Sequence, residues 1–398
     1  MKVCGARGPL RPIRVVPQEL MLLSLLCRGK SFFDVKEWWK NGRWMVAHRL
    51  VNLNLNFRKG VISMKTFKKI AAIIMSVVLL LSFASCSKED SNSNQEKTLK
   101  IGVIQFAPHP SLDNCYNGLI QGLKEAGFED GKNIKIDFQN AQGEVSNSDL
   151  YAKTMVTSKY DMIIGIATPA ALSAYSAAKD AGIPVVFSAV SDPVRPGLVK
   201  TIEKPLNNCT GTSDVLPLEK QIQMIREFLP NAKKIGILYT TSEPNSLTHL
   251  AAFRDLAPKY GFEIEALGVT NASEVASAAV TLTSKGVDCI NNFTDNNVVN
   301  NLPSVINAAN QAKIPVFGSE VEQVKNGCIA AESIDYVSLG VETGKMAAQI
   351  LKGEVKAGEL AVKLISDSKP VYNKQVMDSL GITLPEKYKD AEQVESNR

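Results

Sequence analysis

The chain has 398 residues, of which 45% are hydrophobic and 21% charged, and its formal net charge is +5. Residues 1–85 hold 15 of the 45 Lys and Arg residues but only 3 of the 40 Asp and Glu residues, so residues 86–398 carry 30 basic and 37 acidic side chains, a net charge of −7. The positive overall charge is therefore no sign of nucleic-acid binding. The 313 residues from 86 onward are enough for two domains.

A secretion signal begins at Met64. A basic start is followed by an apolar run from Ile70 to Phe83, interrupted only by two serines. This run is shorter than the roughly 20 residues that a membrane-spanning helix needs, so we expect residues 64–85 to be cleaved rather than to stay as an anchor. Residues 1–63 precede a complete signal and are interpreted as a mis-called start or an extension without a function of its own.

Small residues directly before Cys86 resemble a bacterial lipobox, in which the cysteine is lipidated and becomes the first residue of the mature protein. The sequence thus predicts an extracytoplasmic protein that a lipid at Cys86 holds to the bacterial cell membrane, in the periplasm or on the outer face. The alternatives are an ordinary signal peptide or a fortuitous apolar stretch with a buried cysteine. Residues 86–98 contain almost no apolar side chain and predict a solvated tether.

Four further cysteines follow the tether. None of them lies in a CxxC pair or in a Cys/His cluster with metal-site spacing, so we expect no metal site. Export permits disulfides, but scattered thiols in the core are favoured. The four are Cys115, Cys209, Cys289 and Cys328.

Short β-rich runs and helical stretches alternate from Leu99 onward. This alternation indicates an α/β fold with a parallel sheet covered on both faces. The predicted strands are 100–106, 134–139, 162–167 and 184–190, and the predicted helices between them are 112–126, 148–158 and 170–181.

The same alternation restarts after residues 209–214, which predicts a second unit of similar build. Its predicted helices are 218–228, 246–260, 273–284 and 302–312, and its predicted strands are 234–239, 262–269, 288–293 and 315–318. A helix at 339–352 follows, then a final strand and helix, so the chain is expected to cross between the lobes more than once. We expect residues 99–212 and 333–362 in lobe 1, and residues 213–332 and 363–398 in lobe 2.

Four predicted strands end in a polar residue followed by proline. Proline is tolerated in the first turn of a helix, so each pair predicts a strand-to-helix turn. In open α/β sheets such turns lie where ligands bind, and helix N-termini there attract anions. Asp295, after the strand 288–293, adds a carboxylate suited to an ammonium group. Together these turns favour a site for a zwitterion or a similar small polar solute; the alternative is that they are only helix caps. The four pairs are His109-Pro110, Thr168-Pro169, Asp192-Pro193 and Glu243-Pro244.

Signals for catalysis are weak. The sequence has no Gly-x-Ser-x-Gly, no glycine-rich phosphate loop and no His/Glu set with metal spacing, so it predicts no enzyme and no cofactor. His249 lies in a predicted helix and is interpreted as structural. His109 is the better candidate for a ligand contact because it lies in a strand-end turn.

Several blocks in order resemble the ABC-transporter substrate-binding family that includes the tryptophan/tyrosine-binding lipoproteins. The likeness runs from about residue 100 to 384. It implies a type I periplasmic-binding-protein fold, with two doubly wound parallel-sheet lobes joined by a multi-strand hinge, and permease and ATPase partners. The blocks are His109-Pro-Ser-Leu-Asp113, Ile166-Ala-Thr-Pro169, Phe187-Ser-Ala-Val-Ser-Asp-Pro193, Thr294-Asp-Asn296 and Thr343-Gly-Lys-Met-Ala-Ala348, together with 132–142.

Carried over block by block, the resemblance also implies a set of ligand-binding residues. Pro244, where the family usually has Ala, is a departure within an expected pocket loop. The implied residues are His109, Asp113, Thr168, Pro169, Ser188, Asp192, Ser213, Asp214, Asn245, Ser246, Thr294, Asp295, Asn296 and Asp335.

The main hypothesis is the capture of an aromatic amino acid by an importer's binding protein. Thr168, Ser188 and turn amides would hold its carboxylate, Asp295 its ammonium group and apolar walls its side chain. A sensor that reports a ligand to a membrane receptor, or a binding protein for another small solute, remains the alternative. A transcription regulator would need a helix-turn-helix before the first lobe, where this chain has a lipid signal.

Overall fold

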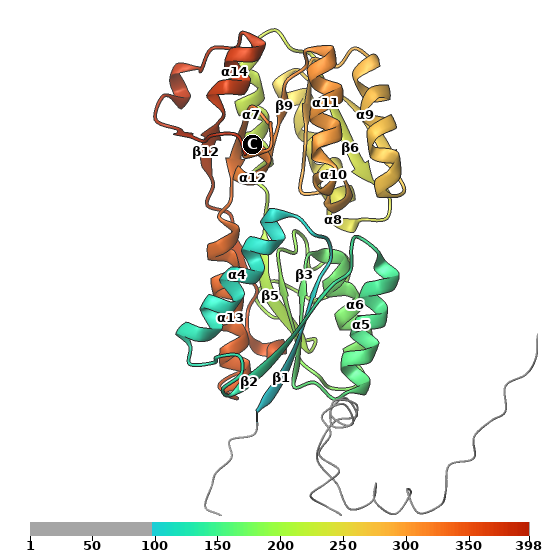
Figure 1. The fold of residues 1–398 in the computed structure, drawn as a ribbon, viewed down its shortest axis with the longest axis vertical. Helices are drawn as coiled ribbons and strands as arrows, with labels where there is room; N and C mark the ends of the chain where they lie inside the picture. The colour runs from blue at the N-terminus through green and yellow to red at the C-terminus, as the bar shows by residue number, and fades with distance from the viewer. Residues whose placement is uncertain (1–97, 398) are drawn as a thin grey trace, which may run out of the picture. The chain divides into compact units, whose positions relative to one another are not determined.

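The computed structural model describes residues 98–397. The predicted leader (1–63), signal (64–85) and Cys86, with most of the tether, lie outside the described residues. Within this range the predicted α/β fold is confirmed, and the structure has two lobes (Figure 1). Among the described residues no helix is both long enough and apolar enough to cross a membrane.

The first lobe is built on a six-stranded sheet of order β11-β5-β4-β3-β1-β2, in which every pair is parallel. Helices α4 and α13 lie on one side of this sheet and α5 and α6 on the other (Figure 1). The strands are β1 (Leu99–Gln105), β2 (Ile134–Asn140), β3 (Met162–Ile166), β4 (Val185–Ser188), β5 (Cys209–Asp214) and β11 (Lys363–Ile365), and the helices are α4 (Pro110–Glu125), α5 (Val145–Thr157), α6 (Thr168–Ala178) and α13 (Tyr336–Leu351).

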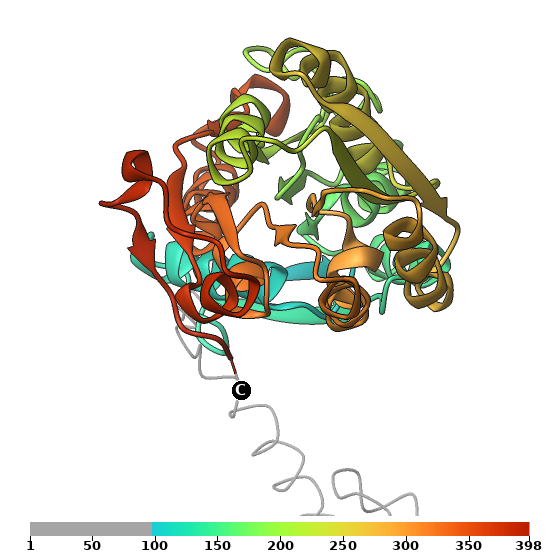
Figure 2. The same ribbon diagram turned by 90° about the horizontal axis from the view of Figure 1, so that it is seen from above.

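The second lobe has a four-stranded parallel sheet of order β7-β6-β8-β9 and a three-stranded sheet of order β10-β12-β13. Seen from above, helices surround the strands and the C-terminal segment runs along one edge (Figure 2). The strands are β6 (Lys234–Thr240), β7 (Glu263–Val269), β8 (Cys289–Asn291), β9 (Val316–Phe317), β10 (Ala330–Ser333), β12 (Lys369–Tyr372) and β13 (Glu392–Gln393), and the helices are α7 (Leu218–Phe228), α8 (Pro244–Leu256), α9 (Val275–Ser284), α10 (Asn296–Asn300), α11 (Leu302–Ala312), α12 (Val321–Lys325) and α14 (Lys374–Leu380).

Three connections join the lobes within the described residues. They run from β5 to α7, from β10 to α13 and from β11 to β12. Leu216 and Ile334, in the first two connections, are buried. The strand β11 pairs with β5, so residues 363–365 lie in the sheet of the first lobe, as do residues 213 and 214 at the end of β5. We had expected both segments in lobe 2.

The helices α4 and α13 pack unusually closely because glycines face each other where they cross. A methyl group at Gly118 would overlap the carbonyl oxygen of Val337, one at Gly122 that of Val341, and one at Gly340 that of Cys115. This close crossing fixes the starts of both helices, where His109 and Tyr336 stand.

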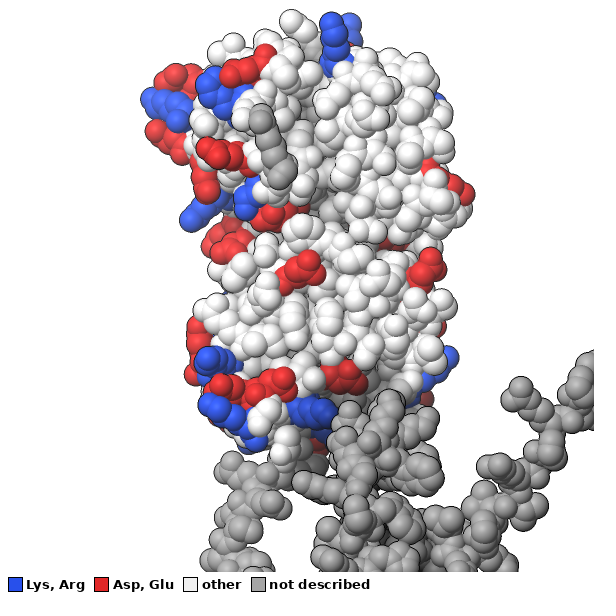
Figure 3. All heavy atoms as spheres, viewed as in Figure 1, with Lys and Arg blue, Asp and Glu red and all other residues white. Residues whose placement is uncertain are grey.

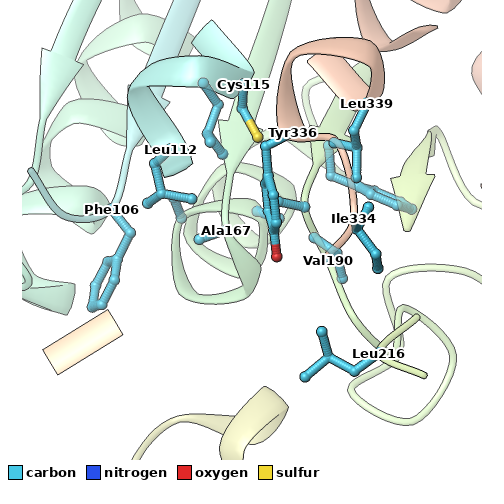
Figure 4. Close-up of a cluster of buried hydrophobic side chains, with 14 of the residues drawn as sticks. Phe106, Leu112, Cys115, Ala167, Val190, Leu216, Ile334, Tyr336 and Leu339 are labelled. Atoms are coloured by element: carbon cyan, nitrogen blue, oxygen red, sulfur yellow. The ribbon is translucent and has the colours of Figure 1, made fainter. Parts of the chain in front are cut away.

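The four cysteines of the described range are buried and free, as expected. Cys115 belongs to a buried cluster around Tyr336, in which Figure 4 shows the tyrosine ring between Cys115 and Val190 and its hydroxyl pointing away from Cys115. This cluster brings α4, α13 and the ends of the central strands together beneath the lobe boundary.

Candidate functional site

A pocket lined by residues of both lobes lies at the carboxyl ends of the strands, where parallel sheets place their ligand sites. The structure brings together there a subset of the predicted ligand residues that are far apart in the sequence. These are His109, Thr168 and Asp214 from the first lobe, and Asn245, Thr294 and Asn296 from the second.

Sequence reasoning missed other residues of the pocket. Tyr336 is the most consequential, because it stands at the start of α13 and follows a hinge connection. In the sequence, the only signal for Tyr336 was its position next to Asp335, a predicted ligand residue. The further lining residues are Ser111, Leu112, Ala167, Ala189, Ser191, Val299 and Gln323.

Asp214 is the carboxylate of the pocket. It is 2% exposed, and its oxygens accept hydrogen bonds from the hydroxyls of Tyr336 (2.7 Å) and Ser191 (3.1 Å). Burial raises the pKa of Asp214 to about 6, against the opposing effect of these two hydrogen bonds. No Lys or Arg lines the pocket in the described part of the chain, so a cationic group of a ligand would find Asp214 without a competing partner.

Three helices begin at strand-end turns around the pocket. Pro110, Pro169 and Pro244 stand in the first turns of α4, α6 and α8, as predicted, and none of the three residues that precede these helices caps them with its side chain. The turn at Asp192-Pro193 was predicted to start a helix as well, and this is wrong. Asp192 instead accepts hydrogen bonds from the amides of Val194 and Arg195 in an irregular turn.

Two alanines of the pocket have backbone conformations that L-residues seldom adopt. Ala167 has φ 77° and Ala189 has φ 55°, and they directly follow β3 and β4. Such conformations cost free energy and gather at ligand sites, where the surrounding structure holds them. Both alanines line the pocket, and Ala167 is the residue directly before α6.

Five buried polar atoms on pocket residues have no hydrogen-bond partner within the described residues. They are His109 Nδ1, Ser111 Oγ, Thr168 Oγ1, Asn245 Oδ1 and Thr294 Oγ1. Buried polar groups are nearly always paired, so a cluster of unpaired ones calls for an explanation. The three hydroxyls can donate to an anion, while the amide oxygen can accept from a cation. The pocket is thus equipped for both ends of a zwitterion.

His109 links the two lobes. Its Nε2 lies 3.4 Å from Oδ1 of Asn296, which belongs to α10. Burial lowers the pKa of His109 to about 4, so the ring is neutral at physiological pH. A neutral ring offers one donor and one acceptor instead of a positive charge.

Asp295, which we expected to hold an ammonium group, does not line the pocket. It is fully buried and accepts hydrogen bonds from the backbone and hydroxyl of Thr240, from Ser246 Oγ (2.6 Å) and from the amide of Val298 (2.9 Å). Four donors occupy its oxygens. The structure therefore places Asp295 as the N-cap of α10 and ties Ser246 to this cap rather than to the pocket.

The remaining predicted ligand residues also lie outside the pocket lining. Ser188 accepts a hydrogen bond from Thr343 (2.9 Å), and Ser213 donates to the carbonyl of Ser191. The other three serve local structure: Asp113 accepts from Gln105, Pro169 lines a separate groove beside α5, and Asp335 caps α13.

The pocket has a volume of about 20 Å³ and adjoins a hollow of about 150 Å³. Both share His109, Ser111, Val299 and Gln323. A space of 20 Å³ holds little more than a water molecule, whereas an engineered cavity of about 150 Å³ takes up benzene. A ring can therefore fit only in the second space or after the lobes have moved.

Other kinds of site find little support. Among the described residues no group of three His, Cys, Asp or Glu side chains could hold a metal ion. The middle of the face shown in Figure 3 carries mostly uncharged and acidic side chains, so this face lacks the basic stripe that a nucleic-acid backbone requires.

Two α/β lobes, three connections between them and a polar pocket at their facing strand ends define a solute-binding protein with the type I periplasmic-binding-protein fold. Residues 100–394 match the family model of the ABC transporter substrate-binding proteins. The chain belongs to this family, whose members are extracytoplasmic solute-binding proteins and not enzymes.

Related proteins agree with this assignment. The tyrosine-binding protein of Clostridioides difficile (strain R20291) is 39% identical over 322 residues, which cover 79% of this chain and 92% of the relative. The ABC domain of Streptococcus pneumoniae, solved in complex with L-Trp, is 41% identical, with a TM-score of 0.72 over 75% of this chain and all of that chain.

A ligand-free, open structure of a substrate-binding protein with adhesive properties from Clostridium difficile is 38% identical, with a TM-score of 0.58 over 75% of this chain and all of that chain. Coverage and identity are nearly the same as for the L-Trp complex, but the TM-score is lower.

Proposed function

We propose that this protein is the lipid-anchored binding protein of an ABC importer and that it captures an aromatic amino acid between its lobes. The set of unpaired polar atoms around Asp214, in one pocket shared by both lobes, carries this proposal. The names of the relatives, which bind tyrosine or were solved with L-Trp, support the aromatic class. A permease and an ATPase would be the partners that receive the solute.

Each part of an amino acid has a suitable counterpart. The hydroxyls of Thr168 and Thr294 and the free N-terminus of α6 suit the carboxylate. Asp214 and the amide oxygen of Asn245 suit the ammonium group. This assignment replaces Asp295, whose oxygens are already occupied, by Asp214 as the charged partner.

The aromatic ring would occupy the adjoining hollow. Its rigid apolar wall could pack against a ring, and it has about the volume of a cavity that holds benzene. Glu320 and Gln323 also line this hollow and could accept a hydrogen bond from a phenol or an indole. The apolar wall consists of Pro108, Pro110, Val299, Leu302 and Pro303.

The affinity for L-tryptophan or L-tyrosine is expected to fall as the pH drops from 7 to 5. The pKa of Asp214 in the ligand-free protein is about 6, while an α-carboxyl and an α-amino group keep their charges over this range. Below pH 6 the ligand must displace a proton from Asp214, so the dissociation constant should rise by about tenfold per pH unit. Titration calorimetry at both pH values measures this, and an unchanged affinity would rule out Asp214 as the ammonium partner.

The lipid anchor is tested separately. Cys86→Ala should abolish labelling by a radioactive fatty acid and release the protein from the membrane fraction, because the thiol of Cys86 is the proposed attachment point. Labelling that survives this substitution would refute the anchor at Cys86 and leave the binding site untouched.

A further inference from the structure

Glu243 lies behind the pocket and organises residues that line it. Its side chain is 2% exposed and stands directly before the first turn of α8. The atom Oε2 accepts three hydrogen bonds: from the backbone N–H of Asn296 (3.1 Å), from Nδ2 of Asn296 (2.6 Å) and from Nδ2 of Asn245 (3.1 Å). Glu243 itself is not among the residues that line the pocket.

The direction of these hydrogen bonds is fixed. A backbone N–H can only donate, so the contact with the amide of Asn296 identifies Oε2 as an acceptor. The other carboxyl oxygen, Oε1, accepts from the amide of Asn297 at 3.3 Å. Burial and, after it, the neighbouring carboxylate of Asp295 raise the pKa of Glu243.

The hydrogen bonds to Glu243 set the orientation of the side-chain amides of Asn245 and Asn296. Because Nδ2 of Asn245 donates to Glu243 and to the carbonyl of Thr294 (3.2 Å), its Oδ1 is left as the unpaired atom on the pocket residue. Because Nδ2 of Asn296 donates to Glu243, its Oδ1 faces Nε2 of His109. An amide oxygen can only accept, so Nε2 of His109 must carry the proton and Nδ1 has the free lone pair.

We propose that Glu243 is a positioning residue that sets the pocket to select a primary ammonium group. It presents Oδ1 of Asn245 and Nδ1 of His109 as acceptors, and with Asp214 these give three acceptors for the three N–H groups of an ammonium ion. This inference rests on the proposed function, since the amino-acid ligand supplies the ammonium group. A site organised in this way rejects an analogue without that group, because its acceptors would stay unpaired.

The experiment compares L-tryptophan and L-tyrosine with their des-amino analogues, indole-3-propionate and 4-hydroxyphenylpropionate. The full-length protein and the variants Glu243→Met and Glu243→Gln are titrated with each pair. The Met variant should lower the preference for the amino acid over its analogue by at least about tenfold, since it removes the acceptor. The Gln variant should keep the preference within about threefold, because its amide oxygen can accept the same hydrogen bonds.

The proton position on His109 gives a second readout that does not depend on ligand or on the folding of the Met variant. Nitrogen NMR of the wild type and of Glu243→Gln should show the proton on Nε2. A proton on Nδ1, or an unchanged amino-acid preference in Glu243→Met, would overturn the inference. Glu227→Met, an exposed change in α7, is the matched control and should leave both affinities unchanged.

Failure of the proposed function and failure of the role of Glu243 give different experimental results. If the wild type binds neither amino acid, the proposed function is wrong whatever the proton position on His109 is. If the wild type binds an amino acid and discriminates against the des-amino analogue, but Glu243→Met does so equally well, only the role of Glu243 is wrong.

Discussion

Asp214→Asn is expected to weaken the binding of L-tryptophan or L-tyrosine by about 100-fold. The substitution keeps the shape of the side chain and its contact with Tyr336, but it removes the charge that faces the ammonium group of the ligand. A hydrogen bond to a charged group contributes up to about 3 kcal/mol, which corresponds to roughly two orders of magnitude in affinity. Titration calorimetry at pH 7 measures the change.

Asp192→Asn is the matched control. Asp192 lies in the same region of the first lobe but caps a turn and does not line the pocket, so its neutralisation should change the affinity by less than about threefold. The affinity of Asp214→Asn should also lose its dependence on pH between 5 and 7. Equal effects of the two substitutions would mean that the net charge of the lobe, and not the Asp214 carboxylate, attracts the ligand.

Gly122→Ala is expected to lower the free energy of unfolding by about 3 kcal/mol, the upper part of the range for overpacked cores. An alanine in the middle of a helix usually stabilises it relative to glycine, by about 1 kcal/mol. Here the added methyl group would overlap the carbonyl oxygen of Val341, and a backbone atom cannot turn aside as a side chain can. The helices α4 and α13 must then separate, which also moves His109 and Tyr336. Denaturant unfolding of the ligand-free protein measures the loss.

Asn117→Ala tests whether the effect comes from the crossing. Asn117 lies on the exposed face of the same helix, so the free energy of unfolding should change by less than about 0.5 kcal/mol. A Gly122→Ala protein as stable as the wild type would show that the two helices tolerate a wider separation than the structure has.

Most of the fold could be predicted because its strands and helices follow regular apolar patterns. β5 is the instructive exception. Its residues, Cys209–Asp214, are all buried although four of the six are polar or charged. The hydroxyl of Thr210 donates to the carbonyl of Leu360, that of Thr212 pairs with Thr343, and Gly211 lets the backbone of Phe187 approach closely. These partners lie elsewhere in the chain, so local hydrophobicity could not reveal the strand.

The location of the site could be predicted from the sequence, but the role of each side chain could not. Proline after a polar residue marks the strand-end turns, and these do surround the pocket. The role of each side chain depends on partners that the sequence does not show. Asp295 lies after β8 and Asp214 is the last residue of β5, but the first caps α10 while the second meets Tyr336 across 122 positions of the chain. Contacts between distant parts of the chain occupy the oxygens of Asp295 and place Asp214 in the pocket, where a ligand can reach it.

Titration calorimetry of the protein, unfolded and refolded to remove any co-purified solute, tests aromatic amino-acid binding most directly. The panel is L-tryptophan, L-tyrosine, L-phenylalanine, L-leucine and small solutes that are not amino acids. We expect micromolar or tighter binding of tryptophan or tyrosine and much weaker binding of leucine. Heat from a solute that is not an amino acid, with none from the aromatic amino acids, would contradict the proposed ligand and the roles given to Asp214 and Asn245.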